Sequence, residues 1–231
     1  MKRVLLKLSG EALAAEQKKG FDEDTVLGVA RQISEVCKAG TQVGVVIGGG
    51  NFWRGRTSET IERSKADQIG MLATLMNAVY VSEMCRHVGL KTRIFTPFSC
   101  GSFAELFSLD QVNQAFEDGQ VCFFAGGTGH PYFSTDTATV LRAVEIQADI
   151  ILLAKSIDGV YDSDPALNPD AVKFDEISIE EVVARKLGVV DLTASILCME
   201  NKMPMQVFAL QEEGSIISTV LGKNKGTIVT V

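Results

Sequence analysis

The sequence lacks the cysteine and histidine patterns that hold metal ions or disulfide frameworks. Its five cysteines form no CxxC pair, and it contains only two histidines. An odd number of cysteines without paired spacing argues against both a disulfide framework and a zinc site. We therefore expect the cysteines to be small buried hydrophobic residues in a reducing compartment. No metal-binding residues are expected from this composition.

Long apolar runs are also absent. The first residues, MKRVLLKLSGEALAA, begin like a secretory signal, but Lys7 interrupts the apolar run after Val4–Leu6. A signal peptide needs about 7–15 apolar residues and a membrane span needs about 20. We therefore expect a soluble, cytoplasmic protein that does not bind membranes.

The chain has no excess of positive charge, because 22 basic residues face 29 acidic ones and the formal net charge is −7. Proteins that bind nucleic acid generally carry a basic face, so no nucleic-acid partner is expected. At 231 residues, 46% of them hydrophobic, the chain is long enough to bury a full core. Internal repeats and low-complexity linkers are absent, which favours a single domain over residues 1–231.

Short apolar runs alternate with helical patterns along the chain. The runs lack polar alternation, which is typical of strands covered on both faces of a sheet. This alternation predicts an α/β fold, a three-layer α/β/α sandwich with a mainly parallel central sheet. The expected strands are Val4–Leu8, Val43–Ile47, Thr92–Phe95, Val121–Ala125, Ile150–Ala154, Val172–Phe174, Gln206–Ala209 and Thr227–Val231. The expected helices are Asp22–Ala39, Ser64–His87, Leu109–Glu117, Thr135–Ala148, Ile179–Leu187 and Leu192–Glu200.

Local residue types set the expected ends of these elements. Ser64 stands before a long run of good helix formers and Gly89 follows that run as a stop. Thr135 and Asp136 suit the first turn of another helix. Asp158–Asp170 is rich in Asp, Pro and Gly, and we expect it to be a loop.

Glycine-rich segments follow three of the expected strands, at Ser9-Gly10, Gly48–Gly50 and Gly126–Gly129. In open α/β sheets, ligands bind beyond the carboxyl ends of the strands. Glycine lets backbone N–H groups approach an anion closely, and helix N-termini add a favourable dipole. Three such loops at one edge of a sheet predict a site that holds several phosphate groups.

The common nucleotide-binding motifs are nevertheless missing. The closest approach to a GxxxxGK[ST] loop, at Gly222–Asn224, has the wrong neighbours, and Trp53 stands where GxGxxG needs its last glycine. The pair Asp162 and Asp164 lacks the glycine and the distal glutamate of a calcium loop. Phosphate binding must therefore use another framework, and a dinucleotide-dependent oxidoreductase is disfavoured.

Four segments together resemble the bacterial uridylate kinases of the amino-acid-kinase superfamily. They are Lys7–Gly10 (KLSG), Gly48–Arg54 (GGGNFWR), Thr128–Asp136 (TGHPYFSTD) and Asp158–Pro165 (DGVYDSDP). The first two are shared across the superfamily, and TGHPYFSTD is similar to uridylate kinases in particular. The resemblance implies the amino-acid-kinase fold and transfer of the γ-phosphoryl group of ATP to UMP, giving UDP and ADP in pyrimidine nucleotide biosynthesis. It also implies an acceptor site in the N-terminal part and an ATP site in the C-terminal part.

The resemblance implies catalytic roles for Lys7, Arg54 and Asp136. Phosphoryl transfer needs positioning and charge stabilisation. Lys7, a compact cation at a strand end, suits the charge that develops between the β and γ phosphates. Arg54 adds a bidentate fork for phosphate, and Asp136 resembles the carboxylate that orients the active-site lysines. The alternatives are a surface lysine, a solvated loop arginine and a capping residue.

The resemblance also implies the residues of the ATP site. Tyr161 and Asp164 fall where the family contacts adenine and ribose, although DSDP can also be a simple Asx-Pro turn. Lys155 lies near the adenine, where relatives carry Asn or Thr. The remaining ATP-binding residues are Lys7, Leu8, Ser9, Gly10, Gly50 and Arg54.

For UMP, the resemblance implies a carboxylate, Asp67, that grips the ribose, although acidic residues favour the start of a helix anyway. A loop that wraps uracil and ribose follows the fourth strand, and His130 stands in it where the family has Asn. The implied UMP-binding residues are Gly49, Asp67, Thr128, Gly129, His130, Pro131, Tyr132, Phe133, Ser134 and Thr135.

The same resemblance implies Mg²⁺ carried by the ATP phosphates, a homohexamer, and possible activation by GTP and inhibition by UTP. The effector segment of relatives is glycine-rich, whereas Ala15–Phe21 carries Lys18 and Lys19 here, so GTP activation does not transfer directly. The stripe Met71, Leu75 and Val79 on the long helix fits either the core or a subunit interface.

Two other functions remain as alternatives. Other kinases of the superfamily act on acetylglutamate, glutamate, aspartate, carbamate or isopentenyl phosphate, but a carboxylate acceptor does not need TGHPYFSTD with Asp67. A non-catalytic relative, such as the metal-oxoanion storage protein of the superfamily, does not need Lys7 and the DSDP loop.

Overall fold

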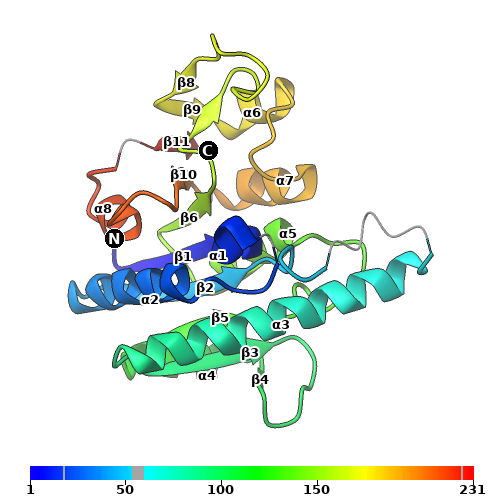
Figure 1. The fold of residues 1–231 in the computed structure, drawn as a ribbon, viewed down its shortest axis with the longest axis vertical. Helices are drawn as coiled ribbons and strands as arrows, with labels where there is room; N and C mark the ends of the chain where they lie inside the picture. Colours follow the sequence, from blue (N-terminus) through cyan, green and yellow to red (C-terminus); the bar gives the residue numbers. More distant parts are fainter. Residues whose placement is uncertain (18, 54–59, 225) are drawn as a thin grey trace.

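Nine strands form one central sheet in the described part of the chain, residues 1–17, 19–53, 60–224 and 226–231 of the computed structural model (Figure 1). The strands are β1 (Arg3–Leu8), β2 (Gln42–Ile47), β3 (Thr92–Thr96), β4 (Glu105–Leu106), β5 (Val121–Phe124), β6 (Ile150–Lys155), β9 (Glu176–Ser178), β10 (Met205–Ala209) and β11 (Thr227–Thr230). Their order is β4-β3-β5-β2-β1-β6-β10-β11-β9, and the β10–β11 pair is antiparallel whereas the other neighbours are parallel. Two short strands, β7 (Val160–Tyr161) and β8 (Lys173–Phe174), pair separately.

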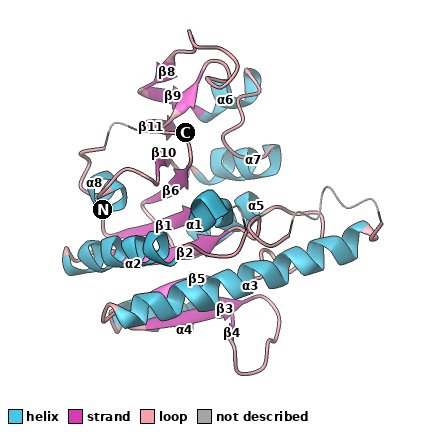
Figure 2. Cartoon of the chain, viewed as in Figure 1, coloured by secondary structure: helices cyan, strands magenta, loops and turns pink. Residues whose placement is uncertain are grey.

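Helices cover both faces of this sheet, so the predicted three-layer α/β/α sandwich is confirmed (Figure 2). Leu6 and Leu8 of β1 pack on one side, whereas Leu5 packs on the other, as the alternation of side chains along a strand requires. One face carries α1 (Gly10–Ala14), α2 (Glu23–Lys38), α3 (Arg63–His87) and α8 (Ser215–Val220). The other carries α4 (Leu109–Glu117), α5 (Thr135–Glu145), α6 (Ile179–Ala184) and α7 (Leu192–Asn201). A short 3₁₀ turn, Ala15–Gln17, follows α1.

The structure corrects two expectations about element ends. Glu62, not Ser64, caps α3, because its side chain accepts a hydrogen bond from the Ser64 N–H at 3.1 Å. The segment 158–170 is not wholly loop, since β7 lies within it. Gly89 does follow the end of α3, with a φ of +90° that suits glycine.

Burial settles two other expectations. Cys85, Cys122 and Cys198 are buried, as predicted, and burial raises the pKa of each thiol to about 12. Cys37 and Cys100 are only partly buried, so the prediction is wrong for these two. Met71 and Leu75 are buried, whereas Val79 is exposed, so the stripe on α3 divides between core and surface. Among the helices of the described residues, none has both the length and the apolar character needed to cross a bilayer.

Candidate active site

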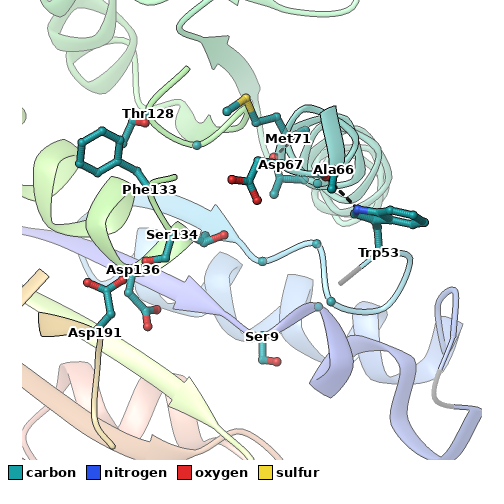
Figure 3. Close-up of a pocket in the computed structure, with 18 of the residues that line it drawn as sticks. Ser9, Trp53, Ala66, Asp67, Met71, Thr128, Phe133, Ser134, Asp136 and Asp191 are labelled. Atoms are coloured by element: carbon teal, nitrogen blue, oxygen red, sulfur yellow. Dashed lines mark hydrogen bonds between the residues drawn. The ribbon is translucent and has the colours of Figure 1, made fainter. Parts of the chain in front are cut away.

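A cleft with a volume of about 330 Å³ opens at the carboxyl ends of β1 and β2 (Figure 3). Because β1, β2, β5 and β6 are parallel neighbours, the loops that follow them meet at this edge of the sheet. The start of α3 lies on one side, and the start of α5 lies on the other. The lining residues used below are Lys7, Ser9, Gly48, Gly49, Gly50, Trp53, Arg63, Asp67, Thr128, Phe133, Ser134, Thr135, Asp136 and Asp191.

Lys7 supplies a cation at the floor of the cleft. Its Nζ lies 3.0 Å from Oδ1 of Asp136, which stands in the first turn of α5. Lys155, the last residue of the adjacent strand β6, donates from Nζ to the carbonyls of Val189 and Gly188. Burial lowers the pKa of Lys155, Asp136 opposes that change, and Lys7 adds to it. One carboxylate therefore lies within the field of two lysines.

The glycine loop after β2 presents backbone donors to the same cleft. The Gly48 N–H donates to the Leu8 carbonyl at 3.0 Å, and the Gly49 carbonyl accepts from the N–H groups of Phe52 and Trp53, both at 3.0 Å. Within the described residues, the N–H groups of Gly49 and Gly50 donate to no other group. These two donors are free to bind an anion.

A side chain at Gly49 would crowd α3, and one at Gly50 would displace the end of the Glu11 side chain. A Cβ at Gly49 would lie 3.0 Å from both Cβ of Ala73 and the Gly70 carbonyl of α3. A Cβ at Gly50 would lie 2.7 Å from Oε1 of Glu11. Glycine at position 49 therefore lets the loop lie close to the backbone of α3.

Asp67 forms the opposite wall, and Figure 3 shows its carboxylate pointing into the open space that Phe133 and Ser134 border from the other side. Its Oδ2 accepts from Nε of Arg63 and from the N–H of Tyr132, both at 2.8 Å. The second contact ties the loop after β5 to α3. Trp53 closes this end of the cleft, with Nε1 donating to the Ala66 carbonyl at 2.8 Å.

The start of α5 is fixed by a second helix. Ser134 caps α5 by accepting from the Thr137 N–H at 3.2 Å, and its hydroxyl donates to Asp191. Asp191 in turn caps α7, accepting from the Ala194 N–H at 2.9 Å. The positive end of the α5 dipole therefore faces the cleft beside Lys7.

A second cavity, of about 500 Å³, lies next to β6 and is lined by Lys155, Tyr161 and Asp164. The Tyr161 hydroxyl donates to Asp158 at 2.8 Å, and Nζ of Lys173 donates to the other carboxylate oxygen at 2.9 Å. The hydrogen bond from Lys173 lowers the pKa of Asp158. Asp158 therefore holds the ring of Tyr161 at the wall of this cavity.

The structure brings most of the predicted site residues together. Eleven of them line the cleft: Lys7, Ser9, Gly10, Gly49, Gly50, Asp67, Thr128, Phe133, Ser134, Thr135 and Asp136. Lys155, Tyr161 and Asp164 line the second cavity. Arg54 lies outside the described residues.

The other predicted residues lie away from the cleft lining. Leu8 is buried in the core, and Asp164 also forms the Asx turn considered as its alternative, accepting from the Ala166 N–H at 2.9 Å. Gly129, Pro131 and Tyr132 belong to the loop after β5 without lining the cleft. His130 lines a third cavity, of about 790 Å³, which shares Thr128 and Phe133 with the cleft.

Nine lining residues are not among the predicted site residues: Gly48, Trp53, Arg63, Ala66, Gly70, Met71, Thr74, Gly127 and Asp191. Thr74 accepts from the Gly126 N–H at 2.8 Å and so joins α3 to the loop after β5. Asp191 precedes an expected helix, and that position identifies a cap but gives no hint of the cleft. Its place in the site depends on the packing of α7 against α5.

The comparisons with known proteins agree with this geometry. The model of the amino acid kinase family matches residues 2–209, and the chain belongs to that family. Within it, the chain is similar to a solved UMP kinase from Ureaplasma parvum, with 35% identity, a TM-score of 0.95, and coverage of 100% of this chain and 99% of that one. A solved UMP kinase from Bacillus anthracis is similar at 33% identity and a TM-score of 0.95, with coverage of 99% and 96%.

Proposed function

We propose that this protein is a UMP kinase, which transfers the γ-phosphoryl group of ATP to UMP and releases UDP and ADP. One observation carries the proposal: two cavities lie at one sheet edge, and Lys155 of the second lies in the field of Lys7 and Asp136 in the first. A phosphoryl donor in the second cavity and a phosphoryl acceptor in the cleft would then both lie close to Lys7 and Lys155. Full-length similarity to two UMP kinases supports this choice of acceptor over the amino-acid substrates of other family members.

UMP is proposed to occupy the cleft. Asp67 offers a charged acceptor for the ribose hydroxyls, since its carboxylate faces the open space and is already oriented by Arg63 and the Tyr132 N–H. Phe133 and Thr128 border the same space. The loop over residues 128–135 is proposed to bind uracil and ribose, and Gly49 to bind the phosphate.

ATP is proposed to occupy the second cavity, with its phosphates directed toward Ser9, Gly10 and Gly50. Tyr161 and Asp164 then contact adenine and ribose, and Lys155 lies between the nucleoside and Asp136. This arrangement divides a proposed single domain, residues 1–231, into an N-terminal acceptor part and a C-terminal ATP part.

Catalysis is proposed to rest on charge placed before the reaction begins. A UMP phosphate oxygen attacks the γ-phosphorus in line, and the bond to the β–γ bridging oxygen breaks as ADP leaves. Lys7, the amides of Gly49 and Gly50 and the start of α5 face the charge that grows during transfer. Asp136 orients Lys7 through the 3.0 Å contact, and Arg54 is proposed to add a phosphate fork. The attacking group is already an anion, so no strong general base is needed.

Mg²⁺ is proposed to arrive with ATP. Within the described residues, no group of three His, Cys, Asp or Glu side chains could hold a metal ion. Mg²⁺ in kinases needs only one or two carboxylates besides substrate phosphates, and Asp136 and Asp191 line the cleft, so the residues present fit this metal. When bound, Mg²⁺ would neutralise part of the negative charge of the ATP phosphates. Asp136 is the carboxylate proposed to contact it.

The proposed assembly is a homohexamer, in the cytoplasm, serving pyrimidine nucleotide biosynthesis. An exposed apolar stripe on α3, formed by Ile69, Leu72, Met76 and Val79, supports self-association. UTP inhibition and GTP activation remain proposals, and Lys18 of the effector segment lies outside the described residues.

Phosphorus NMR of the reaction mixture tests the proposal. Incubation with ATP, Mg²⁺ and UMP should produce the paired resonances of UDP and ADP in equal amounts. ADP without UDP would mean that water, not UMP, accepts the phosphoryl group, and the proposal would then be wrong.

A further inference from the structure

Two buried asparagines form a closed amide pair beneath the glycine loop. Asn51 follows the loop and Asn77 lies on α3, and both side chains are buried. Nδ2 of Asn77 donates to Oδ1 of Asn51 at 2.8 Å, and Nδ2 of Asn51 donates back to Oδ1 of Asn77 at 3.0 Å. Such a reciprocal pair leaves one N–H of each amide for another partner.

Both remaining N–H groups hold backbone carbonyls. Asn77 donates to the Gly48 carbonyl at 2.6 Å, and Asn51 donates to the Gly20 carbonyl at 2.8 Å. Every amide hydrogen of the pair is therefore used. Because an unsatisfied buried amide costs free energy, the pair specifies one arrangement of these segments.

Neighbouring groups leave the pair little freedom. A Cβ at Gly10 would lie 2.4 Å from Oδ1 of Asn51 and 2.4 Å from the Gly48 carbonyl, so the start of α1 packs directly on it. On the other side, Phe21 stacks on Tyr80 at 3.9 Å and meets the edge of Phe52 at 5.3 Å. The segment after Gly20 is thus bound to the same turn by an aromatic layer as well.

The hydrogen bond from Asn77 to the Gly48 carbonyl also fixes the direction of the Gly49 N–H. The Gly48 carbonyl shares its peptide plane with the Gly49 N–H, and in a trans peptide the two groups point in opposite directions. A carbonyl held toward Asn77 therefore turns the Gly49 N–H away from the pair of Asn51 and Asn77. The Gly50 N–H is held in the same way, because the Gly49 carbonyl accepts from Phe52 and Trp53.

We propose that Asn77 and Asn51 are positioning residues for phosphoryl transfer. Asn77 sets the direction of the Gly49 N–H, and Asn51 locks Asn77 and joins the loop to the segment at Gly20. The binding of a phosphate by the Gly49 N–H rests on the proposed kinase function. The orientation itself rests only on the hydrogen bonds.

Asn77→Ala tests this role, with Ser82→Ala as the matched control. Ser82 is buried on the same helix and bonds Oγ1 of Thr92 at 2.8 Å, away from the loop. Hydrogen–deuterium exchange is followed at residues 48–53, and kcat and KM are measured well below the melting temperature of each variant. Asn51→Ser, which keeps the bond from Asn77 to Gly48, replaces Asn77→Ala if that variant does not fold.

The expected result for Asn77→Ala is faster exchange at residues 48–53 and a kcat lower by about tenfold or more, with KM within about threefold. Asn51→Ser should also speed exchange at residues 48–53 and lower kcat, with smaller changes than Asn77→Ala. Ser82→Ala should lower the melting temperature and keep the wild-type kcat. Unchanged exchange or an unchanged kcat in a folded Asn77 or Asn51 variant overturns the proposal. If wild type does not phosphorylate UMP, the proposed function fails, while the exchange result still tests the loop geometry.

Discussion

At the scale of single residues, the charges of the site are held by one another. Lys7 is largely buried and pairs with Asp136, and Lys155 lies beside both with its amine on two carbonyls. A cation held this way needs little reorganisation when charge grows on a phosphate, and that is the condition under which electrostatic stabilisation is large.

Replacing Lys7 with methionine should therefore lower kcat by about 10²–10³, the usual cost of losing one group that meets transition-state charge. KM for UMP should change much less, because Asp67 and residues 128–135 are proposed to bind the acceptor. Steady-state kinetics with UMP and ATP provide the measurement. Lys38→Met, at an exposed lysine paired with Glu35, is the control. A Lys7 variant with a kcat within a few-fold of wild type would show that Lys7 does not stabilise the charge of the transition state.

The lowered pKa of Lys155 should make the free energy of unfolding depend on pH. Burial lowers the folded pKa of Lys155 below its ordinary value of 10.5, so the unfolded chain binds more protons between these two pKa values. The penalty for charging Lys155 is full below the folded pKa and disappears as the pH rises toward 10.5. Urea unfolding of wild type and Lys155→Met should therefore show wild type gaining stability relative to the variant as the pH rises. A difference that is flat or falls with pH contradicts this account.

At the scale of elements, the cap of α7 also holds the start of α5. Asp191→Ala should cost about 0.5–2 kcal/mol in stability through the lost cap, and should also lower kcat because Ser134 loses its partner. Asp191→Asn keeps a capping oxygen and should retain most of the stability. Thermal unfolding and kcat are measured together.

The control for this change is Ser178→Ala, which removes the cap of α6, where Ser178 accepts from the Glu181 N–H at 3.1 Å. It should lower stability without lowering kcat. If Asp191→Ala behaves in the same way, Asp191 serves α7 alone.

Periodic patterns of apolar residues decided which elements the sequence could predict. The helix Leu109–Glu117 was predicted with the bounds it has, because nine residues carry more than two turns of pattern. The two-residue strand β7 lies in a segment rich in Asp, Pro and Gly and was missed, as was the six-residue helix α8. Length alone does not explain these misses, because the equally short β8 and α6 fall within predicted elements. Glu62 and Ser64 are both polar, so backbone geometry alone decided which one caps α3.

The site was predictable where it follows the strands. Lys7 and the glycine loops lie at strand ends, so their meeting follows from a parallel sheet. Asp191 enters from a helix far along the chain, and only tertiary packing places it there. His130 shows the same limit, because a loop predicted as one unit turns that side chain into a neighbouring cavity.

At the scale of the whole molecule, α3 runs from the cleft along one side of the sheet (Figure 1). Its exposed surface carries the apolar stripe of Ile69, Leu72, Met76 and Val79. Changing Leu72 and Met76 on that stripe to glutamate should reduce the sedimenting mass, because a charge cannot be buried there without a partner. Wild type should sediment at six times the chain mass of 24.9 kDa.

Glu83→Gln, an exposed change on the same helix, should leave the sedimenting mass unchanged. Equal sedimenting masses for wild type and the double glutamate variant would show that the stripe is not part of the subunit interface. Sedimentation of wild type at the mass of one chain would contradict the proposed hexamer.

The identity of the acceptor is the central claim, and one coupled assay of ADP release tests it most directly. The chain is given ATP and Mg²⁺ with UMP, CMP, dUMP, acetylglutamate or no acceptor, and kcat/KM is compared. UMP should give the highest value, and dUMP should be slower because Asp67 is proposed to hold the ribose hydroxyls. Turnover of CMP or acetylglutamate that equals or exceeds turnover of UMP would contradict the account.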